Sequence, residues 1–231
     1  MGELLLDADR IRKSPDRHVR KVIDVRFLTE STYRIRCERG ALPFKAGQCA
    51  NLGYPGVGIN REYSTYSGES DPYLDFLIRE IPGGIVSVQL KSLRPGDDIE
   101  VHGFYGDFCI KSPDGGRPHL FVGTGTGIAP FHSFVRSHPQ LDYRIVHGVR
   151  HLGERYDRED YPKDRYTACV SAAAESGAEF RGRVTDYLSQ HAVEPTTYCY
   201  LCGNRAMISA VYELLREQGV PSDNIFAEAW Y

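Results

Sequence analysis

The sequence has no long hydrophobic run. None of its apolar stretches approaches the roughly 18 residues that a membrane-spanning helix needs, and the first residues, Met1 to Asp7, lack the basic and apolar regions of an export signal. The formal net charge of the 231-residue chain is −3, whereas nucleic-acid-binding proteins usually carry a basic excess. These absences predict a cytoplasmic protein that binds neither membranes nor nucleic acids.

The six cysteines lack the spacing of a metal site. Only Cys199 and Cys202 form a close pair, and no second pair completes a zinc or iron–sulfur set. The pair is formally a Cys-x-x-Cys redox motif, but it lies in a predicted apolar strand, where residues three apart point to opposite faces. His102, His147 and His151 also lack ligand spacing. We therefore predict reduced cysteines, histidines that are ordinary polar or satisfied core residues, and no metal centre.

The first half of the chain is typical of a small antiparallel β-barrel. Short runs rich in β-branched and aromatic residues alternate with Gly/Pro turns. The predicted strands cover residues 19–28, 32–37, 48–54, 73–79 and 98–102. A Ser/Pro/Gly-rich stretch at residues 111–118 follows and indicates a linker. We place one domain at residues 1–112 and a second at residues 113–231.

The second half alternates predicted strands with predicted helices. The strands cover residues 119–122, 143–149, 166–170, 197–202 and 226–231, and the helices cover residues 130–137, 184–191 and 206–218. This alternation predicts an α/β domain with a doubly wound parallel sheet. The whole chain is thus expected to have two domains, an antiparallel barrel followed by a parallel α/β sheet.

Two charged segments carry no motif. The N-terminal basic residues are either a solvated stretch or a docking rim for an acidic partner: Arg10, Arg12, Lys13, Arg17, His18, Arg20 and Lys21. The second segment contains Asp157, Glu159 and Asp160 beside Arg155 and Arg158. We predict that it forms a solvated charged loop.

Two segments of the second half follow predicted strands and suit phosphate binding. Gly123 to Pro130 reads Gly-x-Gly-x-Gly and opens a helix, so backbone N–H groups and the helix dipole can approach a pyrophosphate. This is not the standard Gly-x-Gly-x-x-Gly fingerprint, and a merely tight turn is the alternative. Cys202-Gly203-Asn204 places further backbone amides at the carboxyl edge of the sheet, where α/β proteins bind ligands.

Two segments of the barrel half suit a flavin. Arg61-Glu62-Tyr63-Ser64 combines a cation for phosphate, a ring that can stack on isoalloxazine and a hydroxyl for hydrogen bonding. Further on, Pro82-Gly83-Gly84-Ile85-Val86-Ser87 puts two glycines before a predicted helix, which exposes N–H groups that could hold another phosphate.

These four segments, in this order and with an aromatic carboxyl end, resemble the ferredoxin–NADP⁺ reductase family over residues 19–231. The resemblance implies a barrel that holds FAD, which the family's bacterial reductases use rather than FMN, and a second domain for the nicotinamide nucleotide. Arg61 would neutralise the flavin phosphate, Tyr63 would stack on the ring, and Ser64 would hydrogen-bond near N5. The flavin pyrophosphate would be wrapped by Gly84, Ile85, Val86 and Ser87, and the nucleotide would contact Thr124, Gly125, Gly203 and Asn204.

The carboxyl end also resembles the bacterial members, which finish on a glutamate followed by aromatics. Cys202 would lie near the nicotinamide ring and Glu228 near the reactive flavin, so the catalytic residues implied are Ser64, Cys202 and Glu228. Trp230 or Tyr231 would cover the flavin until the nicotinamide displaces it. The order Trp-Tyr reverses the usual Tyr-Trp, which leaves the stacking ring open.

Two arginines favour NADPH as the nucleotide. Guanidinium groups suit a 2′-phosphate, and Arg150 and Arg183 follow the strands of the nucleotide domain. Ala172 stands where many bacterial members place an arginine, so NAD remains possible.

The resemblance implies a flavoenzyme that passes a hydride from NADPH to FAD and single electrons to ferredoxin or flavodoxin. The alternatives are an NADH-dependent reductase component of an oxygenase, a free-flavin reductase, and a non-catalytic flavin-bearing electron-transfer or regulatory subunit.

Overall fold

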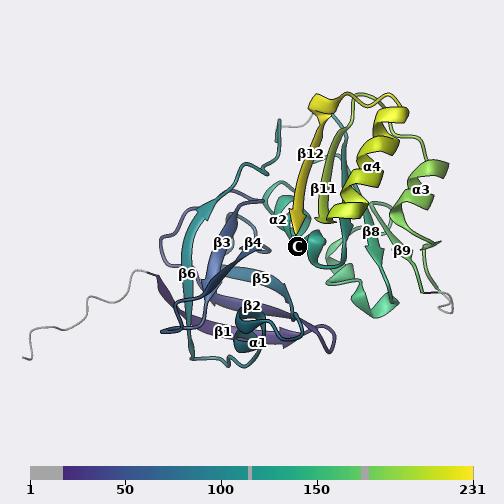
Figure 1. Cartoon of the computed structure of the whole chain (residues 1–231). Coiled ribbons are helices and arrows are strands. Elements are labelled where there is room, and N and C mark those ends of the chain that lie inside the picture. Colours follow the sequence, from purple (N-terminus) through teal and green to yellow (C-terminus); the bar gives the residue numbers. More distant parts are fainter. Residues whose placement is uncertain (1–17, 114–115, 173–176, 231) are drawn as a thin grey trace, which may run out of the picture.

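The computed structural model describes residues 18–113, 116–172 and 177–230. Within them the chain forms two six-stranded sheets, one from each half of the sequence (Figure 1). The basic residues before His18 and the terminal Tyr231 lie outside the described residues. None of the helices in these ranges is long and apolar enough to cross a membrane.

The first sheet is the predicted antiparallel barrel. Its strands are β1 (Val19–Phe27), β2 (Thr32–Glu38), β3 (Cys49–Gly53), β4 (Asn60–Ser64), β5 (Tyr73–Arg79) and β6 (Asp98–Tyr105), and a helix, α1 (Ile85–Lys91), follows β5. The strand order is β4-β3-β6-β1-β2-β5, and a bridge between Thr65 and Phe76 connects the two ends. Strand β4 was not predicted, because its polar sequence shows no apolar alternation.

Alternating side chains build the barrel core. In β2, Tyr33, Ile35 and Cys37 are fully buried, whereas Arg34 and Arg36 between them stay partly exposed. The buried side chains pack with those of the neighbouring strands and of α1 into one cluster. The period of two in the sequence therefore specifies which face of β2 turns inward.

The second sheet is the predicted parallel α/β layer. Its strands are β7 (His119–Thr124), β8 (Tyr143–Val149), β9 (Tyr166–Val170), β10 (Phe180–Arg181), β11 (Tyr198–Asn204) and β12 (Ile225–Trp230), in the order β10-β9-β8-β7-β11-β12. The helices are α2 (Ala129–Ser137), α3 (Val184–Gln190) and α4 (Arg205–Glu217). Helices α3 and α4 cover one face, and α2 lies on the other, toward the barrel (Figure 1).

Each face of the parallel sheet carries its own apolar core. Cys199 belongs to the core under α3 and α4, and Cys202 belongs to the core that α2 shares with the barrel. The two thiols are free and point to opposite faces, as predicted for residues three apart in a strand. This geometry excludes a disulfide between them.

Helix α2 joins the two domains. Ser133 donates to the carbonyl of Ser67 at 2.7 Å, and the guanidinium of Arg136 binds the two carboxylate oxygens of Asp71 at 2.8 and 3.0 Å. Apolar side chains of both halves also share one core with α2, among them Tyr66 of the barrel half. This contact holds site residues from both halves in one arrangement.

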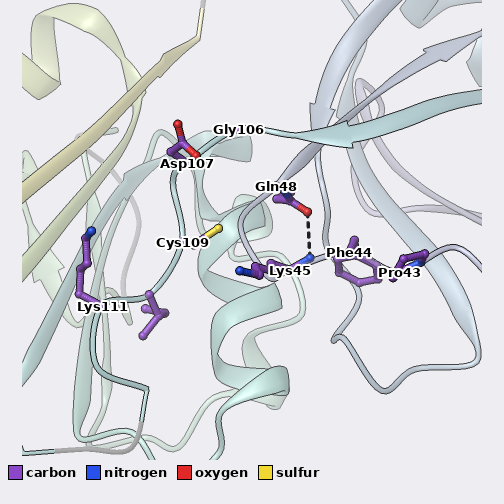
Figure 2. A pocket seen from close by; sticks show the side chains of 9 residues that line it. Pro43, Phe44, Lys45, Gln48, Gly106, Asp107, Cys109 and Lys111 are labelled. Carbon is purple, nitrogen blue, oxygen red and sulfur yellow. Dashed lines mark hydrogen bonds between the residues drawn. The ribbon is translucent and has the colours of Figure 1, made fainter.

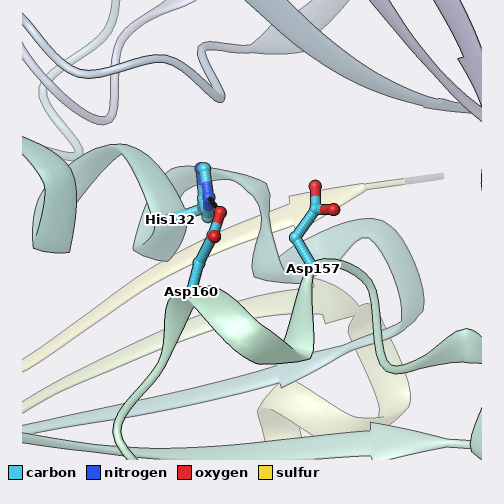
Figure 3. Close-up of side chains that lie close together, drawn as sticks. All are labelled: His132, Asp157 and Asp160. Carbon is cyan, nitrogen blue, oxygen red and sulfur yellow. Dashed lines mark hydrogen bonds and ion pairs between the residues drawn. The ribbon is translucent and has the colours of Figure 1, made fainter.

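The segment 155–160 is not the solvated loop that its charges predict. Asp157 is only 7% exposed and accepts hydrogen bonds from the Tyr66 hydroxyl, at 2.9 Å, and from the Arg26 guanidinium. Asp160 is exposed, yet its carboxylate lies 2.8 Å from Nε2 of the buried His132 (Figure 3). The prediction is wrong because these carboxylates compensate buried donors of other elements, which the local sequence does not show.

Candidate functional site

Strand β12 ends beside the barrel (Figure 1), and side chains from both halves meet there. In the register of β3 and β4, Cys49 lies opposite Ser64, and in that of β11 and β12, Cys202 lies opposite Glu228. The Cys49 thiol donates to Oε1 of Glu228 at 3.6 Å across the domain boundary. The structure thus brings Ser64, Cys202 and Glu228 together, with Cys49 as a neighbour that the sequence did not indicate.

Glu228 titrates near neutral pH. Burial raises the pKa of its carboxyl group to about 7, the hydrogen bonds from Cys49 and Ser64 oppose this increase, and the charge of Glu62 adds to it. Its Oε2 atom is buried and has no hydrogen-bond partner among the described residues. A carboxyl group of this kind can bind or release a proton at physiological pH.

Cys202 is a buried, protonated thiol. Burial and the charge of Glu228 raise its pKa well above the usual range, although the indole N–H of Trp230 donates to its sulfur at 3.1 Å. A thiol is a poor nucleophile in this state. The side chain is therefore suited to pack against a ligand and not to attack it, and Trp230 covers it in this structure.

Strand β4 presents the Arg61–Ser64 motif at the edge of the barrel sheet. Alternation places Arg61 and Tyr63 on one face and Ser64 on the other. Arg61 is exposed, and Tyr63 is partly buried, which raises the pKa of its hydroxyl to about 12. The same face thus offers a cation and a neutral ring.

The second barrel motif forms the turn into α1. Gly84 is the N-cap residue, and no side chain caps the first turn. Ile85 is exposed, Val86 is buried, and the buried Ser87 hydroxyl accepts the backbone N–H of Ile81 at 3.0 Å. The side chains of Val86 and Ser87 therefore stabilise the turn, so a ligand would meet mainly its backbone N–H groups.

A cavity of 460 Å³ lies at the carboxyl ends of β7, β8, β9 and β11. Five predicted nucleotide ligands line it: Thr124, Gly125, Arg150, Arg183 and Asn204. Among the lining residues that the sequence did not indicate are Arg79, Glu154 and Ser171. Arg79 ends barrel strand β5, so both halves of the chain contribute to this cavity.

Close backbone contacts shape this cavity. A Cβ atom on Gly203 would lie 2.4 Å from Oγ1 of Thr124, and the same oxygen accepts the backbone N–H of Asn204 at 3.2 Å. Gly203 also has a φ of +133°, which disfavours any residue with a side chain. The side chain of Asn204 accepts the backbone N–H groups of Ala206 and Met207, so it caps α4.

The buried side chain of His147 contacts the glycine loop at residues 123–130. It is fully buried, and burial lowers its pKa to about 4, so the ring is neutral. The Tyr166 hydroxyl donates to Nδ1 at 2.7 Å, and Nε2 donates to the carbonyl of Gly125 at 2.8 Å. The expectation of a satisfied core histidine is confirmed, and its contact fixes a residue of the nucleotide cavity.

Both signs of charge line the same cavity. The carboxylate of Glu154 accepts the backbone N–H of Arg150 at 2.8 Å, and the side chains of Arg150 and Arg183 are exposed. Arginines attract a phosphate, whereas a carboxylate accepts hydrogen bonds from ribose hydroxyls and repels a 2′-phosphate.

A second cavity, of 580 Å³, opens between the barrel and the linker after β6 (Figure 2). Lys45 and Lys111 line it from the two sides, with Asp107 and Cys109 between them. Burial raises the pKa of the Cys109 thiol, Lys45 lowers it, and the charge of Glu228 is close enough to raise it. The cavity therefore lies near Glu228.

His132, Asp157 and Asp160 are close enough together to hold a metal ion (Figure 3). Protein groups already bind their ligand atoms: Arg26 and Tyr66 bind Asp157, and His132 lies 2.6 Å from the carbonyl of Tyr66 and 2.8 Å from Asp160. Both partners of the His132 ring are oxygen atoms, one in the barrel half and one in the segment 155–160. The contacts of Arg26 and Tyr66 with Asp157, and of Tyr66 with His132, join the two halves, which makes this cluster an interdomain contact.

Comparisons with known proteins identify both halves. The family model of the oxidoreductase FAD-binding domain matches residues 24–110, and that of the oxidoreductase NAD-binding domain matches residues 121–213. The chain belongs to the ferredoxin–NADP⁺ reductase family. Its two domains are of the oxidoreductase type that binds FAD and a nicotinamide nucleotide.

Individual relatives agree with this assignment. The chain is 29% identical to ferredoxin–NADP reductase B of Sorangium cellulosum, over 88% of this chain and 92% of that protein. It is 33% identical to the toluate 1,2-dioxygenase electron transfer component of Pseudomonas putida, over 90% of this chain and 66% of that protein. The ferredoxin NADP⁺ reductase of Neisseria gonorrhoeae with bound FAD and NADP has the same fold, with a TM-score of 0.82 at 24% identity over 92% of this chain and 98% of that one.

Several relatives are longer than this chain. It spans 56% to 67% of five curated relatives, which are reductase or electron-transfer components.

The residues of this chain fit the two cofactors. Exposed Arg61 beside Tyr63 and the uncapped turn at Gly84 suit a flavin phosphate and ring, and the unpartnered Oε2 of Glu228 suits a polar ligand atom.

Proposed function

We propose that this reductase takes a hydride from NADPH and delivers single electrons to a separate ferredoxin or flavodoxin. The observation that carries the proposal is the placement of Glu228. Its carboxyl group, with a pKa of about 7, lies between the barrel strands β3 and β4 and the sheet edge that lines the nucleotide cavity. The bound flavin supplies the change from two-electron to one-electron transfer.

Residues 1–112 would hold FAD in this proposal. Arg61 would bind the flavin phosphate through charge-assisted hydrogen bonds, Tyr63 would lie against the ring, and Ser64 would hydrogen-bond near its reactive edge. The turn at residues 84–87 would present backbone N–H groups to the pyrophosphate, which agrees with its uncapped first turn.

Residues 113–231 would hold the nucleotide. Thr124, Gly125, Gly203 and Asn204 would contact it at the carboxyl edge of the sheet, where parallel α/β sheets bind ligands. Cys202 would lie beside the nicotinamide. Trp230 donates to the Cys202 sulfur, so it occupies the position that the nicotinamide would take and would have to leave it. Tyr231, the other candidate covering ring, lies outside the described residues.

The charges of the cavity favour NADPH modestly. Arg150, Arg183 and the cross-domain Arg79 line the cavity as three cations, and Glu154 opposes them as one anion. A 2′-phosphate would gain from the cations and lose from the carboxylate, which leaves NADH as a usable second nucleotide.

An acidic electron acceptor would approach the second cavity. Lys45 and Lys111 flank it (Figure 2), and the charge of Glu228 acts on Cys109 in its lining. Positive side chains at a docking face raise the association rate of an acidic partner.

An NADH-dependent reductase component of an oxygenase is the second candidate. Relatives named as such components support it, among them the toluate 1,2-dioxygenase electron transfer component and the propane 2-monooxygenase reductase component of Mycolicibacterium smegmatis, 33% identical to this chain. The carboxylate of Glu154 in the nucleotide cavity supports it as well.

Anaerobic stopped-flow mixing of the FAD-loaded protein with NADPH or NADH tests the proposal. We expect faster flavin bleaching with NADPH, followed by one-electron reduction of an added ferredoxin or flavodoxin. Faster bleaching with NADH and delivery to an oxygenase partner would establish the second candidate, and turnover only with free flavin would identify a free-flavin reductase. A yellow protein that neither nucleotide bleaches would be a non-catalytic subunit.

A further inference from the structure

The contact between Cys49 and Glu228 is a specific one between the two domains. Cys49 is 3% exposed, and strand register places its side chain beside that of Ser64. Glu228 enters from β12, 179 residues later, and its Oε1 lies 3.6 Å from the Cys49 sulfur. The thiol therefore meets only one of the two carboxyl oxygens.

Cys49 can act only as a donor in this contact. Burial and the charge of Glu228 raise the pKa of its thiol far above the usual range, so the proton stays on sulfur. An ionised carboxylate only accepts hydrogen bonds. The contact is therefore an S–H···O bond whenever Glu228 is charged, and the thiol is unsuited to nucleophilic or redox chemistry.

The other oxygen of Glu228 is in a different situation. Oε2 is buried and has no hydrogen-bond partner among the described residues. The ionisable groups that face the carboxyl group are Cys49 on β3, Glu62 on β4, Cys202 on β11 and Cys109 in the linker after β6. The Ser64 hydroxyl also lowers the pKa of Glu228, whereas Cys49 is the residue whose hydrogen bond to Oε1 crosses the domain boundary and fixes the orientation of the carboxyl group.

We propose that Cys49 is a positioning residue for Glu228: its thiol donates to Oε1, fixes the carboxyl group across the domain boundary, and leaves Oε2 as the oxygen that binds and releases the proton. The catalytic consequence rests on the proposed function, whereas the contact and the proton position do not. A hydrogen bond to a carboxylate favours its charged form, so Cys49 also holds the pKa of Glu228 below the value that burial alone would give.

Infrared titration of the FAD-loaded protein tests this proposal. The C=O stretch of the protonated Glu228 carboxyl is followed across the neutral pH range, and Glu228→Gln identifies the band. In Cys49→Ala and in the volume-conserving Cys49→Val, we expect the apparent pKa of Glu228 to rise by about half to one unit. Cys49→Ser keeps a donor and should titrate at or below the wild-type value.

Cys199→Ala is the matched control. It removes another buried thiol, in the core on the opposite face of the parallel sheet, and should leave the Glu228 band unchanged. A titration that does not move in Cys49→Ala and Cys49→Val would overturn the proposal. Equal shifts in all three Cys49 variants, serine included, would overturn it too, because they would show a packing effect.

The same variants separate this proposal from the proposed function. In an active reductase, the pH profile of flavin reduction should move with the infrared titration in Cys49→Ala and return in Cys49→Ser. A wild-type protein that neither NADPH nor NADH reduces would refute the proposed function, and the infrared titration would still decide the role of Cys49.

Discussion

Removing the Tyr66 hydroxyl would weaken the polar contact between the two domains. Tyr66 is 1% exposed, its hydroxyl donates to Asp157 at 2.9 Å, and its ring stacks on His132 with ring centroids 3.8 Å apart. In Tyr66→Phe the stacked ring remains, so the change removes one hydrogen bond to a buried carboxylate. Such bonds contribute about 1.5–3 kcal/mol. Arg26 still pairs with Asp157, so we expect the free energy of unfolding to fall by about 2 kcal/mol.

Urea unfolding measures this loss. The single tryptophan, Trp230, lies at the domain boundary and reports on it by fluorescence, while circular dichroism follows the sheets. Tyr54→Phe is the control, because Tyr54 is 37% exposed and its hydroxyl should matter by less than about 0.5 kcal/mol.

A double-mutant cycle with Asp157→Asn isolates the pair. Asp157 has a φ of +46°, a conformation that asparagine tolerates better than most residues, so this variant limits backbone strain. We expect the two changes to be non-additive by at least about 0.5 kcal/mol. Additive effects, or a loss in Tyr66→Phe no larger than in Tyr54→Phe, would show that the cluster does not stabilise the domain contact.

Three further predictions concern the site itself. Glu228 has a pKa of about 7 in the folded protein, above the ordinary 4.5, so the folded state binds more protons between these values and stability falls as pH rises through that window. Glu228→Gln should remove about 1–2 kcal/mol of this dependence in urea unfolding at several pH values, and an unchanged slope would contradict the assigned pKa. Arg150→Ala should raise the KM for NADPH about fivefold more than that for NADH. Glu154→Gln should lower the KM for NADPH relative to that for NADH, because it removes a carboxylate that repels the 2′-phosphate. Equal effects on both nucleotides in steady-state assays would show that these residues do not select the nucleotide. Trp230→Ala should tighten the binding of oxidised nucleotide several-fold, because the nucleotide would no longer have to displace the Trp230 ring. Ring stacking of this kind contributes about 0.5–1.5 kcal/mol. Calorimetric titration showing no tightening would make the ring merely structural.

Local sequence determined most of the secondary structure and both sets of ligand motifs. Strand alternation and glycine turns involve neighbouring residues, so β2 and β11 could be predicted within one or two residues, as could the turn into α1. Strand β4 could not be predicted because Arg61–Ser64 is polar and shows no apolar alternation. It is a strand because it pairs with β3 at the edge of the sheet. The two-residue β10 is too short for any periodic pattern.

The tertiary structure alone decided the chemistry that those motifs carry. Cys49 and Glu228 are 179 residues apart, and Tyr66 and Asp157 are 91 apart, so no local pattern relates either pair. In the sequence Asp157 resembles any other surface carboxylate, whereas in the structure it is buried where Arg26 and Tyr66 of the barrel half bind it. In the sequence Glu228 resembles an ordinary glutamate. In the structure β12 places it against barrel strand β3, where removal from water raises its pKa to about 7. Burial and charge compensation depend on which segments pack together, and strand pairing across the whole chain determines that packing.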